Sequence, residues 1–308
     1  MRSVSRSLAA ASRGGQWPRS WGLAALLWLL TAMAPAALAA TPVTVLKVQD
    51  AIGPASADYV LRGMRDAAAA GAPLVVIQLD TPGGLDSAMR QIIQGILNAT
   101  VPVAVHVAPE GARAASAGTY ILYAAHVAAM APATTLGAAT PVAIGIGGAP
   151  PQRPGARDDD APADDKDAKE GAADPAERGR RAPAPADASA AKAVHDAAAY
   201  IRGLAQLRER NAEWAERAVR EAVSLTAEEA LRENVIDVIA EDVPELLARI
   251  DGRTVKLGNR EHTLVTAGLA HQEVLPGARH RLLSVIANPS FALVLMMIGI
   301  YGLIFEFS

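Results

Sequence analysis

The sequence predicts an α/β fold in which helices flank a parallel sheet. Short apolar runs, typical of strands buried on both faces, alternate with segments whose apolar residues recur at helical spacing. Strands are expected at 43–48, 74–79, 101–107 and 127–130, and helices at 57–70, 85–97 and 116–125. Because strands and helices alternate with short connections, we expect parallel pairing through right-handed crossovers.

The second half of the chain continues this pattern. Helices are expected at 192–207, 212–222 and 242–250, a short strand at 235–239 and a small hairpin at 254–264. A further helix is expected after Thr226, because Glu229 three positions on completes the pattern of a capping box.

Composition excludes several classes of function. The chain has 308 residues, 51% of them hydrophobic, a net charge of −3 and no cysteine. A near-neutral charge gives no indication of nucleic-acid binding. The absence of cysteine excludes disulfides, thiolate metal sites and a cysteine nucleophile.

The N-terminus has the pattern of a secretory signal. Four arginines between positions 2 and 19 precede an apolar stretch at 22–30, and Ala37-Leu38-Ala39 is a small-x-small site. We therefore expect residues 1–39 to be a signal peptide, with an uncleaved membrane anchor as the alternative. Either reading places the main domain on the extracytoplasmic side, periplasmic or extracellular.

The C-terminus contains a second apolar segment, residues 290–305. Its length is at the lower limit of the roughly 17–25 residues that a helical span needs. A buried core helix is the alternative, but Gly299, Gly302 and apolar residues on all sides favour a membrane. We expect a C-terminal transmembrane segment, with 283–308 the start of a membrane region.

Residues 147–191 have a different composition, rich in Ala, Pro, Gly and mixed charges. Such a stretch cannot bury enough apolar area to offset its ordering entropy, so we expect a disordered insertion. It is either a surface insertion without a role or a mobile flap. The main domain is expected to span 40–250, followed by a linker at 251–282.

Two short motifs follow the second and third expected strands. Asp80-Thr81-Pro82-Gly83-Gly84 offers bare backbone N–H groups, and the stretch 114–120 places Ser116 at the start of a helix. A serine beside free backbone N–H groups can act as a nucleophile next to an oxyanion hole. The N–H groups of Ala117 and Gly84, or less favourably Gly83, would donate hydrogen bonds to the oxyanion. The alternative is an ordinary N-cap serine and an ordinary glycine turn.

A serine nucleophile needs a base. His126 is ten positions along the same helix, about 15 Å away at 1.5 Å per residue, and is better explained as a core histidine. His195 stays open. Lys192 is the better candidate, because it stands among small uncharged residues and burial would favour its neutral amine. The alternative is a solvated lysine.

The chain resembles the NfeD family of membrane serine proteases, within the ClpP-like and signal-peptide-peptidase-A-like class. The resemblance is carried by the stretches 75–84, 114–120, 130–138 and 225–231. It implies a ClpP/crotonase-like fold and a Ser–Lys dyad without histidine. By motif position Ser116 matches the nucleophile, Lys192 the base, and Gly84 and Ala117 the oxyanion donors, with no metal or organic cofactor.

The function that the resemblance implies is a membrane-anchored serine endopeptidase that cleaves apolar segments of membrane-associated proteins. Expected partners are a stomatin-like membrane protein as substrate, membrane lipid and further copies of the chain in a homo-oligomer. Two alternatives stay open: a non-catalytic membrane scaffold with the same fold, and a crotonase-type acyl-thioester enzyme.

Overall fold

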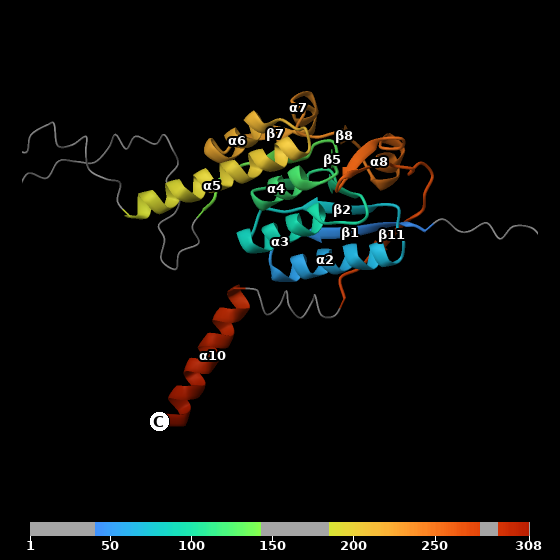
Figure 1. Ribbon diagram of the computed structural model, residues 1–308. Coiled ribbons are helices and arrows are strands. Elements are labelled where there is room, and N and C mark those ends of the chain that lie inside the picture. The colour runs from blue at the N-terminus through green and yellow to red at the C-terminus, as the bar shows by residue number, and fades with distance from the viewer. Residues whose placement is uncertain (1–40, 143–184, 278–288, 308) are drawn as a thin grey trace, which may run out of the picture. The chain divides into compact units, whose positions relative to one another are not determined.

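The computed structural model describes residues 41–142, 185–277 and 289–307 (Figure 1). Its main sheet has six strands in the order β11, β1, β2, β3, β5, β8, and every neighbouring pair is parallel. Their bounds are β1 Val43–Gln49, β2 Val75–Asp80, β3 Val103–Val107, β5 Val127–Met130, β8 Val238–Ile239 and β11 His271–Val274. The predicted α/β class with a parallel sheet and flanking helices is confirmed. The expected signal peptide at 1–39 lies outside the described residues.

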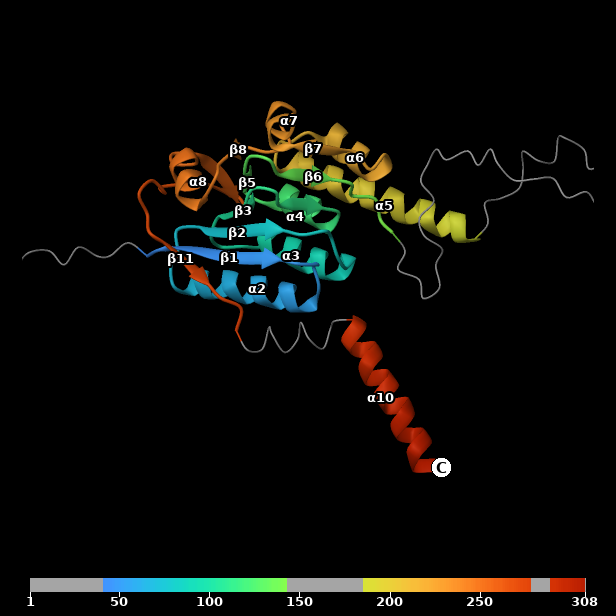
Figure 2. The same ribbon diagram turned by 180° about the vertical axis from the view of Figure 1, so that it is seen from behind.

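The sheet is buried on both faces, as its apolar strands predict. Alternate residues of β2 face opposite sides: Val75 and Ile77 join one core, Val76 the other. The first core is shared with six helices, α2 Pro54–Ala69, α3 Asp86–Leu97, α4 Ala117–Ala124, α5 Pro185–Leu207, α6 Ala212–Arg220 and α7 Ala227–Arg232. The second is covered by α8 Val243–Arg249 and by the predicted hairpin, β9 Thr254–Leu257 and β10 Arg260–Thr263. Figure 2 shows the same helices and strands from behind.

A second, small sheet was not predicted. It consists of β4 Arg113–Ala115, β6 Thr135–Gly137 and β7 Ser224–Thr226, with β6 in the middle. A single bridge between Thr81 and Ala114 connects it to the loop after β2. The sheet therefore carries the segment that leads directly into Ser116. Beyond β7, α7 Ala227–Arg232 begins with the predicted capping box of Thr226 and Glu229.

The structure differs from the sequence prediction in two stretches. α5 begins at Pro185, inside the stretch 147–191 that was expected to be disordered; residues 143–184 lie outside the described part. The alanines at the start of α5 explain the difference, since alanine has the highest helix propensity while adding little hydrophobicity. The stretch 251–282, expected as a linker with a hairpin, also contains β11, which pairs with β1 at the edge of the main sheet.

Helix α10, Pro289–Phe307, follows near the C-terminus. The expected transmembrane segment is not supported, because no helix among the described residues combines the length and the apolar character that crossing a membrane requires.

Candidate active site

Ser116 lies at a strained turn between a strand and a helix. β4 ends at Ala115, α4 begins at Ala117, and Ser116 between them has φ 50° and ψ −114°. A positive φ is costly for a residue with a side chain and persists only where the surroundings impose it. Its backbone N–H donates to the Gly137 carbonyl at 3.1 Å, and its side chain is partly exposed. Enzymes of the α/β-hydrolase fold present their nucleophilic serine at a comparable turn between a strand and a helix.

The residues after Ser116 explain why the turn holds. The buried Thr119 hydroxyl is 2.9 Å from the Ala114 carbonyl and 3.2 Å from that of Gly137, so it ties the first turn of α4 to β4 and β6. A Cβ at Gly118 would lie 2.7 Å from the Thr81 methyl carbon. Glycine is therefore required for α4 to approach the loop after β2 so closely.

The glycine loop passes directly beside Ser116. A Cβ at Gly83 would lie 2.8 Å from the Ser116 Cβ. The Gly83 N–H donates to the Thr81 hydroxyl at 3.1 Å, whereas the exposed Gly84 N–H has no hydrogen-bond partner among the described residues. On the other side, the Ile52 N–H donates to the Gly83 carbonyl at 2.7 Å. The loop geometry favours Gly84 over Gly83 as a donor to a ligand.

The structure thus brings three of the four predicted site residues together. Gly84 adjoins Gly83, which contacts Ser116, and Ala117 is the next residue in the chain. Ala117 is also the first residue of α4, where N–H groups have no intrahelical partner and the helix dipole is positive. Two backbone donors and one hydroxyl therefore lie beyond the carboxyl ends of β2 and β4. Ligands of parallel α/β sheets bind at this edge.

Lys192, the fourth predicted residue, lies near the start of α5 with its side chain exposed. α5 runs parallel to α4: Tyr120 and Tyr200 stack with centroids 6.2 Å apart, and Arg208, just past the end of α5, reaches the last turn of α4. At about 1.5 Å per residue, Ser116 precedes Tyr120 by about 6 Å and Lys192 precedes Tyr200 by about 12 Å. Lys192 is therefore toward the Ser116 end of the helix pair. The part of the chain that the structure describes contains no hydrogen bond between Lys192 and Ser116.

Sequence reasoning missed a polar cluster beside this helix pair. Arg90 of α3 contacts Asp86, Asp196 and the ring of Tyr200, and Tyr200 in turn stacks on Tyr120. Burial, with a smaller effect of Asp86, raises the pKa of Tyr120, so its hydroxyl stays protonated. The only local signal was the spacing of four between Asp86 and Arg90.

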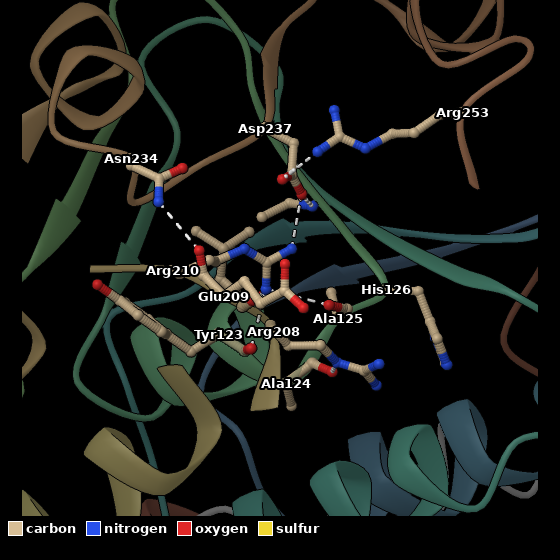
Figure 3. Close-up of polar contacts among 12 residues, drawn as sticks. Tyr123, Ala124, Ala125, His126, Arg208, Glu209, Arg210, Asn234, Asp237 and Arg253 are labelled. Carbon is tan, nitrogen blue, oxygen red and sulfur yellow. Dashed lines mark hydrogen bonds and ion pairs between the residues drawn. The ribbon is translucent and has the colours of Figure 1, made fainter. Parts of the chain in front are cut away.

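Two arginines hold the opposite end of α4 (Figure 3). Arg210 Nη1 donates to the carbonyls of Tyr123 and Ala125 at 2.9 and 3.0 Å, and Arg208 Nε donates to that of Ala124 at 2.9 Å. Cations at the carboxyl end of a helix interact favourably with its dipole. The helix that begins at the candidate nucleophile is thus fixed at its far end.

Arg210 is itself buried and ion-paired. Its Nη2 lies 2.6 Å from Asp237 Oδ2, which also accepts the Ala128 N–H of β5 at 2.7 Å. The second carboxylate oxygen accepts from Arg253 at 2.6 Å (Figure 3). The ion pair of Arg210 and Asp237 therefore links the end of α4 to β5 and to the segment before β8.

The histidines considered as bases occupy other places. Buried His126 accepts the Val103 N–H at 3.2 Å, and burial followed by the charge of Arg208 lowers its pKa to about 3. It follows the end of α4 that is remote from Ser116, as expected of a core histidine. Exposed His195 lies 3.3 Å from Arg220.

The fold and this geometry define a class: α/β proteins with a parallel sheet and a serine presented at a strained strand-to-helix turn. Comparisons with known proteins narrow the class. The family model described as NfeD1b, N-terminal domain, matches residues 42–154. A membrane-bound protease of Pyrococcus horikoshii is 35% identical over 238 residues, 77% of this chain and 46% of that protein. The chain thus spans about half the length of this curated relative.

Solved structures are similar over most of the chain. A lysine-to-alanine mutant of a membrane-bound stomatin-specific protease, in complex with a substrate peptide, matches with a TM-score of 0.63 and 33% identity over 81% of this chain and 99% of that one. A serine-to-alanine mutant matches with a TM-score of 0.61 and 32% identity over 78% and 100%. A membrane protease from Pyrococcus horikoshii specific for a stomatin homologue matches with a TM-score of 0.60 and 30% identity over 80% and 98%. The chain belongs to the NfeD family.

Proposed function

We propose that the chain is a membrane-associated serine endopeptidase in which Ser116 is the nucleophile and Lys192 the base. The observation that carries the proposal is the strained turn at Ser116 beside a glycine loop whose Gly84 N–H is unoccupied within the described residues. Similarity to a membrane-bound protease supports peptidase activity. Its solved neighbours include mutants in which a serine or a lysine is replaced, the two residue types of the proposed dyad.

In the proposed reaction the neutral Lys192 amine takes the hydroxyl proton of Ser116 while Oγ attacks the carbonyl carbon of a peptide bond. The carbonyl oxygen becomes an oxyanion and accepts hydrogen bonds from the N–H groups of Gly84 and Ala117. The lysine ammonium then protonates the leaving amine as the C–N bond breaks. Water, deprotonated by the same amine, hydrolyses the acyl-enzyme and restores Ser116.

We further propose that the substrates are apolar segments of membrane-associated proteins, a stomatin-like protein among them. One similar solved protease is specific for a stomatin homologue, which supports this choice. Helix α10 carries large exposed apolar side chains along its length, which supports association with a membrane. The arginine-rich, then apolar N-terminus supports an extracytoplasmic location. The expected homo-oligomer stays a prediction.

Labelling of the full chain with a fluorophosphonate probe tests the dyad. We expect Ser116→Ala to abolish labelling, and Lys192→Ala to slow it by at least about 10²-fold, the usual contribution of a general base. Exposed Ser87 of α3 and exposed Lys256 of β9 provide the matched controls Ser87→Ala and Lys256→Ala, which should label like the parent.

Other results would redirect the proposal. Labelling that survives Ser116→Ala would refute the nucleophile, and labelling that survives Lys192→Ala would make His195 the next candidate base. A parent that neither labels nor cleaves would favour the scaffold alternative. Acyl-thioester turnover independent of Ser116 would favour the crotonase-type enzyme.

A further inference from the structure

Three helices meet at Arg90, next to the proposed dyad. The guanidinium carbon of Arg90, on α3, lies 4.4 Å from the centroid of the Tyr200 ring of α5, which stacks on Tyr120 of α4. Arg90 Nη2 also donates to Asp196 Oδ2 of α5 at 2.7 Å. One guanidinium therefore fixes both a ring and a carboxylate of the helix that carries Lys192.

Asp196 is the natural ion-pair partner of Lys192. The two residues are four apart on α5, so their side chains emerge on the same face one turn from each other. An ion pair with Asp196 would stabilise the protonated amine, which is the form that cannot accept the serine proton. In the structure the Asp196 carboxylate is bound by Arg90, and no ion pair of Lys192 occurs within the described residues.

The second carboxylate of this cluster is also bound by Arg90. Asp86 Oδ2 accepts from Arg90 Nε at 2.8 Å. On the side of α6, exposed His195 of α5 lies 3.3 Å from Arg220, and Arg220 and Arg202 both pair with Glu216. α4, also packed on α5, contributes Tyr120, whose hydroxyl donates to the Ala139 carbonyl at 3.2 Å. A single side chain, Arg90, thus pairs with both Asp86 and Asp196.

We infer, on the basis of the proposed function, that Arg90 is a positioning residue for the base: it occupies Asp196 and so leaves the Lys192 amine without an acidic partner. The cluster is largely solvent-exposed, since the Asp196 side chain is 67% exposed and that of Arg90 33%. Exposed ion pairs contribute little to folding stability. Variants at Arg90 should therefore fold, and their effect should be on proton transfer.

The test is the pH dependence of the rate of fluorophosphonate labelling of the full chain. In Arg90→Gln, Asp196 is free to pair with Lys192, so we expect the pH of half-maximal rate to rise. Well below that pH the rate should fall about two- to fivefold, the range for one exposed ion pair, while the high-pH plateau stays near the parent value. Adding Asp196→Asn should restore the parent profile. Arg249→Gln, which removes a comparably exposed pair with Glu245 on α8, is the matched control.

Three results would overturn the inference: an Arg90→Gln profile that superimposes on the parent, a shift that persists in the double variant, or a lowered plateau without a shift, which would indicate packing alone. Thermal unfolding of each variant shows that the chain is folded. Failure of the proposed function is recognised separately, because labelling of Lys192→Ala would then equal that of the parent. If Lys192→Ala is inactive and Arg90→Gln is unchanged, only the role of Arg90 is refuted.

Discussion

Arg210→Ala is expected to destabilise the fold strongly, because it removes the group that holds the far end of α4. The Arg210 side chain is 2% exposed and ion-paired with Asp237. It also donates to carbonyls of the last turn of α4, those of Tyr123 and Ala125. Its loss leaves these carbonyls without their cationic donor and Asp237 without its buried partner.

The expected cost follows from these contacts. Removing one member of a buried ion pair costs about 3–5 kcal/mol, because the remaining charge is left uncompensated. Asp237 would keep Arg253 and the Ala128 N–H, which moderates the penalty, whereas the abandoned helix carbonyls add to it. We therefore expect a loss of about 3–5 kcal/mol. At about 2–4 °C per kcal/mol for a domain of this size, the melting temperature should fall by about 6–20 °C.

Thermal unfolding followed by circular dichroism measures this change. Arg253→Ala is the matched control, since Arg253 contacts the same carboxylate but its side chain is 43% exposed, and it should cost no more than about 1 kcal/mol. Arg210→Lys, which keeps the charge but not the planar fork, should lie between the two. Equal melting temperatures for Arg210→Ala and Arg253→Ala would refute the idea that this pair holds α4.

Three further outcomes are expected. Gly84→Ala should abolish probe labelling, because its Cβ would lie 2.1 Å from the Ile52 carbonyl oxygen, whereas Gly53→Ala, with open space around its Cβ, should label normally. Thr119→Val should lower the free energy of unfolding by about 1–3 kcal/mol in urea titrations, because the buried carbonyls lose the hydroxyl; an unchanged midpoint would contradict this. His126 has a pKa of about 3 when folded, below its unfolded value, so its contribution is complete above about pH 6.5 and is lost as pH falls toward 3. Between pH 7 and pH 4 the protonation of His126 should therefore lower the free energy of unfolding by roughly 3 kcal/mol. In denaturant titrations, the free energy of unfolding of His126→Asn should fall less over this pH range than that of the parent.

The strands from β1 to β8 of the main sheet and the hairpin could be predicted from the sequence, whereas the three strands of the small sheet and β11 could not. β2 and β3 are apolar runs buried on both faces, a pattern with few alternatives. β4, β6 and β7 have three residues each and no alternation to detect, because their existence depends on the neighbours with which they pair. β11 is exposed along its length and is defined only by its register with β1.

In the candidate site, too, residues within local motifs could be predicted, whereas residues brought together only by the fold could not. Ser116 and Gly84 could be proposed from the sequence because each belongs to a short local motif. The glycines of these motifs lie where the backbone approaches neighbouring atoms too closely for a Cβ. Arg90 and Asp196 are 106 positions apart, and nothing near either residue points to the other. Their contact exists only because α3 and α5 lie against the same helix, which local sequence does not encode.

The order of the strands has a consequence for synthesis. The stretch 41–142 supplies β1, β2, β3 and β5, the middle of the sheet, whereas β8 and β11 at its two edges come from 185–277. Proteins are made from the N-terminus, so the proposed nucleophile emerges first, in a sheet with both edges uncovered. The proposed base emerges later, on α5, and β11 later still. In an unfinished chain the proposed nucleophile would therefore lack its proposed base until α5 has been made, while both edges of the sheet are still unpaired.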